Sequence, residues 1–318
     1  MNKNGSRNVR VSIGLPVYNG ENFLRQAIDS LLTQTFPDFE LIISDNASTD
    51  STEQICREYE CRDPRVRYFR NPRNIGAAEN FNRAFELSNG EYFKWSAHDD
   101  MCGPDFLLRC VEALDKNPST VLAYPKAKNM NKDGVLREEV LWPRGDSSTP
   151  QERFGILMGM KNCYPVFGLM RTSALKKTTL HGKFPGSDKI LLARLSLLGQ
   201  LQEVPEFLFF RRIHANKSVR AFPSYHERAI FFDPELEGKI VFPRFKLCGE
   251  YFAAISDTPL THQQRISCYY QLIRRFRWFG LSKDIGIAAM LLFRRTSTPK
   301  ATANHANSNG SPAHRGKV

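Results

Sequence analysis

The first hundred residues alternate between two apolar periodicities, and this alternation constrains the fold more than any other feature. Apolar side chains recur at every second position from Val9 to Leu15, which is typical of a strand. They then recur at helical spacing over residues 23–32, a helix that Phe36-Pro37-Asp38 ends. The same succession predicts strands over residues 39–44, 66–69 and 92–97, a helix that begins near residue 50 and another over residues 77–87. Strands that alternate with helices of about 10–15 residues predict a doubly wound, mostly parallel α/β sheet with right-handed crossovers.

Capping residues, prolines and apolar patterns predict where further helices and strands begin and end. Asp50 is the expected N-cap of the second helix, because Glu53 follows at capping-box spacing. Pro104 is expected to open a helix that runs through Leu114. The pattern also predicts strands over residues 121–124 and 207–210, long loops with short strands over residues 126–150, and a Leu-rich helix over residues 187–199.

Positive charge is concentrated in the last third of the chain. The 318 residues carry a formal net charge of +12. Residues 1–205 hold 27 Lys and Arg against 25 Asp and Glu, a net charge of +2, whereas residues 206–318 hold 18 against 8, a net charge of +10. A basic region attracts an anionic partner such as nucleic acid, lipid headgroups or a phosphorylated acceptor, or it serves only as a solvated surface.

Membrane-spanning and export signals are absent from the sequence pattern. The longest apolar run, Ile285 to Phe293, has nine residues, far fewer than the ~20 that span a bilayer. No apolar signal core follows the basic N-terminal residues, so we expect no export. The seven cysteines form no C-x-x-C pair and are expected to be reduced thiols, neither a disulfide framework nor a zinc site. We therefore expect a cytoplasmic protein.

Small, turn-forming and acidic residues follow three of the predicted strands. The first strand runs into Pro16-Val17-Tyr18-Asn19-Gly20, the second into Asp45-Asn46-Ala47-Ser48, and the fourth into His98-Asp99-Asp100. In open parallel sheets the ligand crevice lies beyond the carboxyl ends of the strands, where these segments meet. Neither G-x-G-x-x-G nor G-x-x-x-x-G-K-[ST] occurs, which disfavours a dinucleotide site and a P-loop. An acidic crevice suits Mg²⁺ or Mn²⁺ that bridges a substrate diphosphate, whereas an Asp-Asp pair alone is also common on surfaces.

This combination resembles glycosyltransferase family 2, the inverting nucleotide-sugar transferases with the GT-A fold. The resemblance covers roughly residues 9–215. It rests on three segments in order, with fitting spacing, and on the acidic pair: residues 11–19 (VSIGLPVYN), residues 42–50 (IISDNASTD), residues 74–77 (NIGA), and Asp99-Asp100. It implies a GT-A catalytic domain over residues 1–218, followed by a helical, basic extension over residues 219–295. Residues 296–318 are Ser, Asn, Ala, Pro and Gly with scattered charges, and we expect a disordered tail there.

The resemblance also implies roles for individual residues. The nucleotide part of the donor is implied to lie against Pro16, Val17, Tyr18, Asn19, Asp45, Asn74 and Asp99. Within this set Asp45 would accept a hydrogen bond from the base, and Asp99 would face the ribose. Asp100 would ligate the Mg²⁺ or Mn²⁺ ion that bridges the diphosphate.

The sequence departs from the usual pattern of the family in two places. His98 stands where the first carboxylate of the acidic triplet is expected, so two carboxylates remain. The Q-x-x-R-W segment of processive synthases is absent, because Arg274 rather than Gln precedes Arg277-Trp278. The second departure favours transfer of one sugar per encounter over polymer synthesis.

Inverting transfer needs a carboxylate that takes the proton from the attacking acceptor hydroxyl. The family places this base at the start of a late helix, and Asp188 is the best match by that criterion. Alternatively, Asp188 only complements the helix dipole. His214, in the segment RRIHANKS, would ligate the metal or bond a phosphate oxygen, with Arg212 or Lys217 supporting the leaving charge. A structural hydrogen bond is the alternative for His214.

Arginines and aromatic residues interleave over residues 265–295, which is typical of helices that lie in a membrane interface. The alternative is a helical cap that buries the aromatics against the catalytic domain. The expected partners are a nucleotide-sugar donor, a glycan or lipid-linked acceptor and an anionic membrane surface at the inner face, but no nucleic acid.

Competing hypotheses are a basic nucleic-acid-binding protein, a catalytically silent scaffold of the same fold and a nucleotidyltransferase. No nucleic-acid-binding signature supports the first, and the four aspartates (Asp45, Asp99, Asp100 and Asp188) argue against the second.

Overall fold

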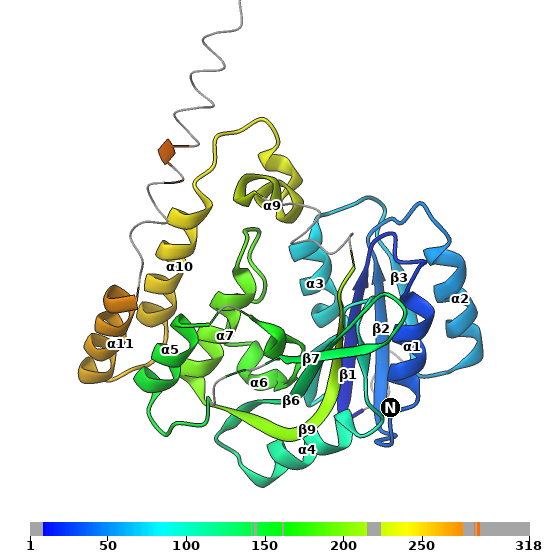
Figure 1. Cartoon of the computed structure of the whole chain (residues 1–318), viewed down its shortest axis with the longest axis horizontal. Coiled ribbons are helices and arrows are strands. Elements are labelled where there is room, and N and C mark those ends of the chain that lie inside the picture. The colour runs from blue at the N-terminus through cyan, green and yellow to red at the C-terminus, as the bar shows by residue number, and fades with distance from the viewer. Residues whose placement is uncertain are drawn as a thin grey trace, which may run out of the picture.

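The structure is a computed structural model of the whole chain, and it describes residues 9–140, 142, 145–160, 162–214, 224–275, 283 and 285–286. Four parallel strands form its first half: β1 (Val11–Val17), β2 (Phe39–Asp45), β3 (Val66–Arg70) and β4 (Tyr92–Trp95). They lie in the order β3-β2-β1-β4, and every residue of β1, β2 and β4 is buried. Helices α1 (Leu24–Leu32), α2 (Thr52–Arg62) and α3 (Ala77–Glu86) connect these strands (Figure 1). The doubly wound first half predicted from the sequence is confirmed.

The second half of the sheet continues beyond β4. Helix α4 (Phe106–Lys116) follows the short strand β5 (Met101–Cys102). The remaining strands are β6 (Thr120–Met130), β7 (Leu136–Val140), β8 (Leu169–Arg171) and β9 (Gln200–Arg212). Strand β8 is antiparallel to both β4 and β6, whereas β6 and β9 are parallel to each other. The described residues thus form one mostly parallel sheet in the order β3-β2-β1-β4-β8-β6-β9-β5, with β7 beside β6.

Strands β6 and β9 are much longer than the sequence predicts. Each was expected to have four residues, but β6 has 11 and β9 has 13. The two strands pair along most of their length, with register shifts between Thr120 and Leu122 and on both sides of Lys126. Pro125, beside the second of these, has no backbone N–H to donate. The polar parts of β6 and β9 have the composition of loops. They form strand because each strand supplies the hydrogen-bonding partners of the other.

Helix α2 begins differently from the expected capping box. Its N-cap is Ser51, and no side-chain cap bond forms there. The Asp50 carboxylate instead accepts from the backbone N–H of Thr52 at 3.0 Å and from that of Glu21 at 3.1 Å. The Glu53 carboxylate pairs with Arg57 at 2.9 Å rather than reaching back to the cap. Asp50 thus joins the start of α2 to the loop after β1.

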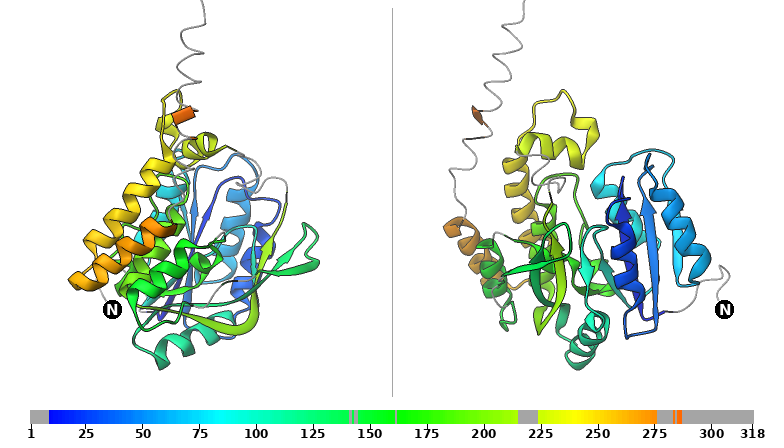
Figure 2. Two further views of the ribbon diagram at one scale, coloured as in Figure 1. Left: turned by 60° about the vertical axis from the view of Figure 1, so that its left-hand side comes forward. Right: turned by 45° about the vertical axis from the view of Figure 1, so that its right-hand side comes forward.

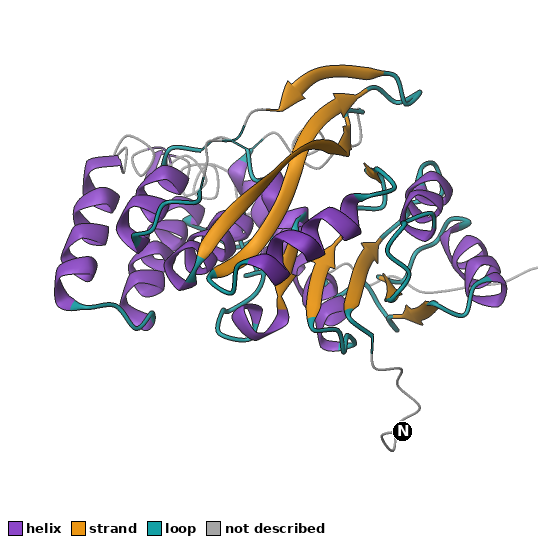
Figure 3. Cartoon of the chain, turned by 90° about the horizontal axis from the view of Figure 1, so that it is seen from below, coloured by secondary structure: helices purple, strands orange, loops and turns teal. Residues whose placement is uncertain are grey.

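Helices cover the sheet on both sides (Figure 3). The second half of the chain adds α5 (Pro150–Met158), the 3₁₀ turn η1 (Tyr164–Phe167), α6 (Thr172–Leu175) and α7 (Ser187–Leu198). It continues with α9 (Tyr225–Phe232), η2 (Pro234–Leu236), α10 (Pro243–Asp257) and α11 (His262–Arg275). No helix in the described parts of the chain is long and apolar enough to cross a membrane.

Helices α10 and α11 pack against α5 and α7 rather than against the sheet (Figure 2). They share a second apolar core, separate from that of the sheet, whose buried members are Phe154, Phe184, Ile190, Ala193, Leu197, Tyr251, Ala254, Ile255, Cys268 and Leu272. Between residues 225 and 275 the chain is mostly helical, in α9, η2, α10 and α11. The expected domain boundary at residue 218, most of residues 276–295 and the expected disordered tail lie outside the described residues.

Candidate functional site

The loops after β1 and β2 are joined to each other by short polar contacts. Asn19 adopts a left-handed backbone conformation with φ 50°, and its N–H donates to the Ser48 hydroxyl at 2.9 Å. Its side-chain oxygen accepts from the Thr49 N–H at 2.9 Å. The N–H of Gly20 donates to the Thr52 hydroxyl at 2.8 Å. Asn19 therefore fixes the position of the β2 loop.

Four of the residues expected to contact the nucleotide lie together at the end of β1. Pro16 and Val17 are buried within the strand, and Val17 pairs with Asp45 of β2. Tyr18, which follows the strand, is 43% exposed, so its ring is available to a ligand at this edge. Asn19, beside it, is also exposed.

The Asp45 carboxylate is fully buried and is bonded on both oxygens. Oδ1 accepts from the N–H of Ser48 at 2.9 Å and from its hydroxyl at 2.5 Å. Oδ2 accepts from the Tyr68 hydroxyl at 2.7 Å and from the Arg70 guanidinium at 3.3 Å. Burial, assisted by this hydrogen bond to Asp45, raises the pKa of Tyr68 far above its usual range. Both carboxylate oxygens are therefore already bonded, and a direct bond from Asp45 to a nucleotide base would replace one of these contacts. The bonds from Tyr68 and Arg70 connect Asp45 to β3.

Four asparagines join the loops after β2 and β3 to helix α3 in one network. The Asn46 amide donates to Asn74 Oδ1 at 2.7 Å, and its oxygen accepts from the Ile75 N–H at 2.9 Å. Asn71 donates to Asn46 at 3.1 Å and to Asn80 at 3.0 Å. Asn74, expected to border the nucleotide, is exposed at the rim of this network. The sequence pattern singled out Asn74 but not Asn46 or Asn80, because a buried amide network leaves no periodic signal.

The acidic pair after β4 is buried and anchored to β9. Asp99 and Asp100 are 7% and 3% exposed. Oδ1 of Asp100 accepts from the backbone N–H of Arg212 at 2.8 Å. Nε2 of His214 lies 2.8 Å from Oδ2 of Asp99, and the His214 ring packs against Phe23 with the ring centroids 4.9 Å apart. The structure thus brings Asp99, Asp100 and His214 together from two strands that are distant in sequence.

Arg212 is the residue that holds this arrangement. Its side chain is fully buried, and the guanidinium donates to the backbone oxygen of Asp99 at 2.9 Å, to that of Lys132 at 2.7 Å and to Gln26 Oε1 at 2.7 Å. It also lies over the Phe23 ring, 4.6 Å from the centroid. Burial lowers the pKa of Arg212, and the charges of Asp99 and Asp100 oppose this effect. Arg212 was expected to support the leaving charge, but its donors are directed into the protein. Lys217, the alternative, lies outside the described residues.

Asp99, Asp100 and His214 offer hard oxygen atoms and one imidazole nitrogen, a set that suits Mn²⁺ and, through its oxygens, Mg²⁺. Within the described residues, no group of three or more His, Cys, Asp or Glu is arranged to hold a metal ion on its own. The protein ligands would therefore be few, which is the usual situation of Mg²⁺ bound through one or two carboxylates and substrate phosphates. The donor set fits a cation that binds together with a diphosphate.

Asp188 lies in the first turn of α7, after Gly186, whose φ of 87° requires the left-handed conformation that glycine adopts without strain. Its Oδ1 accepts from the N–H of Lys189 at 2.9 Å. Burial raises the pKa of the Asp188 carboxyl, and its hydrogen bonds to Lys189 and to the Cys163 thiol offset only part of this effect. A carboxylate that only complements a helix dipole normally has a lowered pKa. The raised pKa of Asp188 therefore shows that burial outweighs the effect of the helix dipole.

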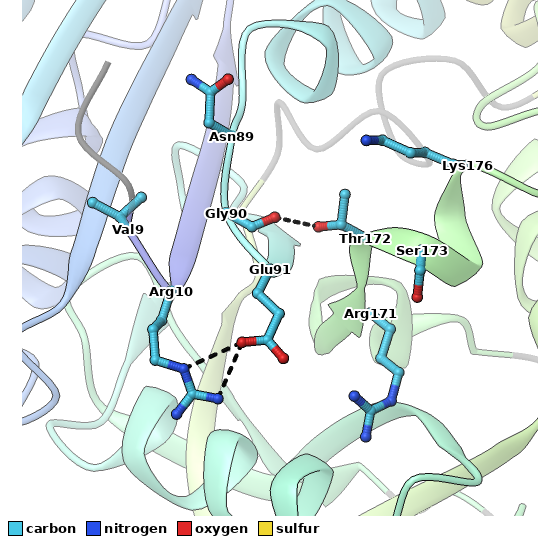
Figure 4. A pocket seen from close by; sticks show the side chains of 9 residues that line it. All are labelled: Val9, Arg10, Asn89, Gly90, Glu91, Arg171, Thr172, Ser173 and Lys176. Carbon is cyan, nitrogen blue, oxygen red and sulfur yellow. Dashed lines mark hydrogen bonds and ion pairs between the residues drawn. The ribbon is translucent and has the colours of Figure 1, made fainter. Parts of the chain in front are cut away.

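A hollow of about 500 Å³ lies at the opposite edge of the sheet, where β1 and β4 begin (Figure 4). Its lining is formed by Val9, Arg10, Asn89, Gly90, Glu91, Arg171, Thr172, Ser173 and Lys176. None of the predicted site residues is among them. Ligands of open parallel sheets bind at the carboxyl ends of the strands, so we place the candidate site at the other edge.

Comparison with solved structures shows the same fold. The chain matches S. aureus TarS 1-349 in complex with UDP with a TM-score of 0.53 at 17% identity, over 91% of this chain and 92% of that one. It matches the mannosyltransferase PcManGT from Pyrobaculum calidifontis, in complex with GDP-Man and Mn²⁺, with a TM-score of 0.51 at 14% identity, over 92% and 84% of the two chains. These likenesses confirm the expected GT-A fold.

Comparison with curated proteins gives shorter but closer matches. An uncharacterized glycosyltransferase from Rickettsia bellii (strain RML369-C) is 36% identical over 149 residues, 46% of this chain and 21% of that protein. Chondroitin synthase from Pasteurella multocida (strain Pm70) is 34% identical over 126 residues, 40% of this chain and 13% of that protein. The chain thus spans about a fifth or less of the length of these two relatives. The model of the family described as glycosyl transferase family 2 matches residues 12–179, more than half of the chain. The chain therefore belongs to glycosyl transferase family 2.

Proposed function

We propose that this protein is an inverting glycosyltransferase that moves one sugar from a nucleotide-sugar donor to a hydroxyl of a glycan or lipid-linked acceptor at the cytoplasmic face of a membrane. The observation that carries the proposal is the convergence of Asp99, Asp100 and His214 at the carboxyl ends of the parallel strands, next to the asparagine network. Family membership supports glycosyl transfer, and the solved relatives bound to UDP and to GDP-Man support a nucleotide-sugar donor.

The nucleotide part of the donor would lie over the loops after β1 and β2. Tyr18 offers an exposed ring to the base, and Asn19 and Asn74 offer amide groups at the rim. Because these loops are tied to one another by buried hydrogen bonds, they present their polar groups without a large ordering cost on binding. Asp45 would either bond the base directly or hold the loop through Ser48.

The diphosphate would lie next to the acidic pair. Asp100 and His214 would hold Mg²⁺ or Mn²⁺, and the ion would neutralise the charge that develops on the departing diphosphate. Asp99 would orient the imidazole of His214 through the 2.8 Å contact and face the ribose with its remaining acceptor capacity.

Asp188 would act as the base. Its carboxylate takes the proton from the acceptor hydroxyl while the hydroxyl oxygen forms a bond to C1 of the donor sugar. The bond between C1 and the diphosphate oxygen breaks with its electron pair, and the nucleoside diphosphate departs from the opposite face. A raised pKa makes the Asp188 carboxylate a stronger base than an ordinary aspartate, which supports this role.

The absence of a Q-x-x-R-W segment supports transfer of one sugar per encounter. Products from a defined acceptor would distinguish this from polymerisation, because a single-sugar transferase adds one residue even when donor is in large excess. A ladder of longer products would contradict this part of the proposal.

The donor is identified by screening UDP-, GDP- and dTDP-sugars with Mn²⁺, measuring the thermal midpoint and the release of nucleoside diphosphate. We expect one donor class to raise the midpoint in the presence of Mn²⁺ and to release nucleoside diphosphate slowly. If no nucleotide-sugar stabilises the protein with or without metal, the proposed function is wrong.

A further inference from the structure

The outer face of α11 exposes three large apolar side chains at helical spacing. Ile266 is 70% exposed, Tyr270 61% and Ile273 55%. With about 100° per residue, Tyr270 and Ile273 lie about 40° and 20° from Ile266 around the helix axis. The buried residues Cys268 and Leu272 lie on the opposite side, about 200° and 240° from Ile266, where they enter the second apolar core. The exposed residues therefore form a stripe that no other described part of the chain covers.

Helix α10 extends this apolar surface. Phe245 and Phe252, seven positions apart on α10, are 42% and 40% exposed. The ring of Phe252 stacks on Tyr269 of α11 with the centroids 5.7 Å apart, and Tyr269 bonds Ser256 at 2.8 Å. The exposed faces of the two helices meet at this contact. Both helices lie at the edge of the molecule away from β1–β3 (Figures 1 and 2). We call the surface formed by Phe245, Phe252, Ile266, Tyr270 and Ile273 the α10–α11 face.

The charges on the α11 side of this face are positive, whereas the two carboxylates of α10 are paired, Glu250 with Lys246 at 2.9 Å and Asp257 with Arg194 at 3.0 Å. Residues 262–283 contain no Asp or Glu, whereas they contain five Lys and Arg: Arg265, Arg274, Arg275, Arg277 and Lys283. Arg274 is exposed beside Ile273. A second copy of this chain would bring two basic surfaces together, which disfavours a symmetric dimer through the same face. Scattered single apolar residues are normal on a surface. An aligned apolar stripe with a basic border instead matches a partner that has an apolar interior and an anionic surface.

We infer that the α10–α11 face lies in the interface of an anionic bilayer, with Ile266, Tyr270 and Ile273 in the acyl boundary and Arg265 and Arg274 towards the headgroups. A helix with an apolar stripe and a basic polar face is the form that lies in a membrane interface without crossing it. This inference rests on the exposed side chains and charges alone, so it does not depend on the sugar chemistry proposed above.

The test uses the full chain and two kinds of vesicle, phosphatidylcholine alone and phosphatidylcholine mixed with phosphatidylglycerol in equal amounts. In co-sedimentation at low salt, we expect binding to the anionic vesicles and little to the neutral ones. The triple variant Ile266→Ser, Tyr270→Ser, Ile273→Ser should bind the anionic vesicles at least roughly tenfold more weakly, because it lacks most of the apolar contact. The matched control is Val135→Ser with Leu136→Ser, which removes two equally exposed apolar side chains from the β6–β7 hairpin. The control should bind as the parent does.

The electrostatic part has its own pair of variants. Arg274→Glu should weaken binding to anionic vesicles by at least roughly fivefold, since each basic residue near an anionic surface contributes about that factor. Lys177→Glu makes the same charge change on the exposed side of the α6–α7 connection and should have little effect. Absence of binding by the parent chain would overturn the inference. Equal loss in the triple variant and its control would overturn it too.

Three further measurements distinguish membrane binding from dimerisation, from loss of folding and from loss of the proposed reaction. If the parent chain dimerises and the triple variant does not, the face is a subunit interface and the inference is wrong. Thermal midpoints should stay within a few degrees of the parent value, because the replaced side chains are exposed. Hydrolysis of the donor by the triple variant should equal that of the parent, so a failure of the proposed reaction does not affect the vesicle result.

Discussion

Nε2 of His214 lies 2.8 Å from Oδ2 of Asp99, although the two residues are 115 positions apart. The contact joins the end of β9 to the turn after β4. Family members are recognised by segments in the first half of the chain, but this site is completed by a residue of the last third. His214 is therefore the clearest point at which the C-terminal half enters the candidate site.

His214→Ala should weaken metal-dependent donor binding by roughly 10- to 100-fold, the range usually seen when a metal ligand or its supporting partner is lost. The Kd of the donor with Mn²⁺, measured by calorimetry, provides the test. His262→Ala, at the exposed start of α11, is the control and should leave the Kd unchanged. Equal affinity in His214→Ala and the parent would remove His214 from the metal site.

Asp188→Asn should abolish transfer while the affinity for donor and metal stays within about threefold of the parent, because a base acts on the acceptor proton and not on donor binding. Asp38→Asn, on the exposed turn before β2, is the control. Single-turnover transfer with saturating donor measures the activity of both variants, and only Asp188→Asn should be inactive. Normal turnover by Asp188→Asn would refute the assignment of the base.

The raised pKa of Asp188 predicts a particular pH dependence. The acid limb of kcat/KM should lie above the usual aspartate value of about 3.9, because the base must be ionised. A carboxyl whose pKa is higher in the folded than in the unfolded state lowers stability once the pH exceeds the unfolded value. Asp188→Asn should therefore have a higher thermal midpoint than the parent at pH 7, and the gap should close as the pH falls to about 4. A gap that is constant with pH would contradict this.

Arg212→Met should lower the free energy of unfolding by about 2 kcal/mol, since it leaves the buried backbone oxygen of Asp99 without the guanidinium donor and removes the hydrogen bonds to Lys132 and Gln26. Donor binding should weaken as well, because the turn loses the guanidinium bond to the backbone oxygen of Asp99, although the backbone N–H of residue 212 still donates to Asp100. Urea denaturation and donor calorimetry measure the two effects. Arg137→Met, on the exposed strand β7, should change neither.

The orientation of the Asn80 amide can be tested by two substitutions. Its oxygen accepts from the Ser44 hydroxyl at 2.7 Å and from Asn71 at 3.0 Å, and its nitrogen donates to the Ser44 carbonyl at 2.9 Å. Asn80→Ala should cost about 2 kcal/mol of unfolding free energy. Asn80→Asp should cost more at neutral pH, because a carboxylate oxygen would then face a carbonyl. If Asn80→Asp is as stable as the parent, the amide is oriented the other way.

The local pattern was sufficient for much of the first half of the fold. Strands β1 to β4 and helices α1 to α3 agree with the predicted ranges to within about two residues, because each is encoded by a run of adjacent residues. The main error there was at Asp50, where the capping-box spacing was present but the carboxylate bonds Glu21 and Thr52 instead. A tertiary partner on another loop competed with the local cap.

The second half was less predictable. Strands β6 and β9 were underestimated because their polar residues become strand only when the other strand is present. Arg212 was expected at the diphosphate, but the fold buries it behind the acidic pair. Nothing in its local sequence distinguishes a buried anchoring arginine from an exposed one.

The sequence by itself determined the succession of strands and helices, the acidic and amide residues that follow the strands, and hence the edge of the sheet at which a ligand would bind. These properties depend on neighbouring residues, whose periodicity follows from the geometry of helix and strand. The tertiary structure alone decided that His214 contacts Asp99, that Arg212 bonds both Asp99 and Asp100, that the Asp188 carboxyl has a raised pKa and that one face of α11 is not covered by any other described part of the chain. Those properties depend on which distant segments become neighbours, and burial and charge at a site are set by those neighbours rather than by the residue itself.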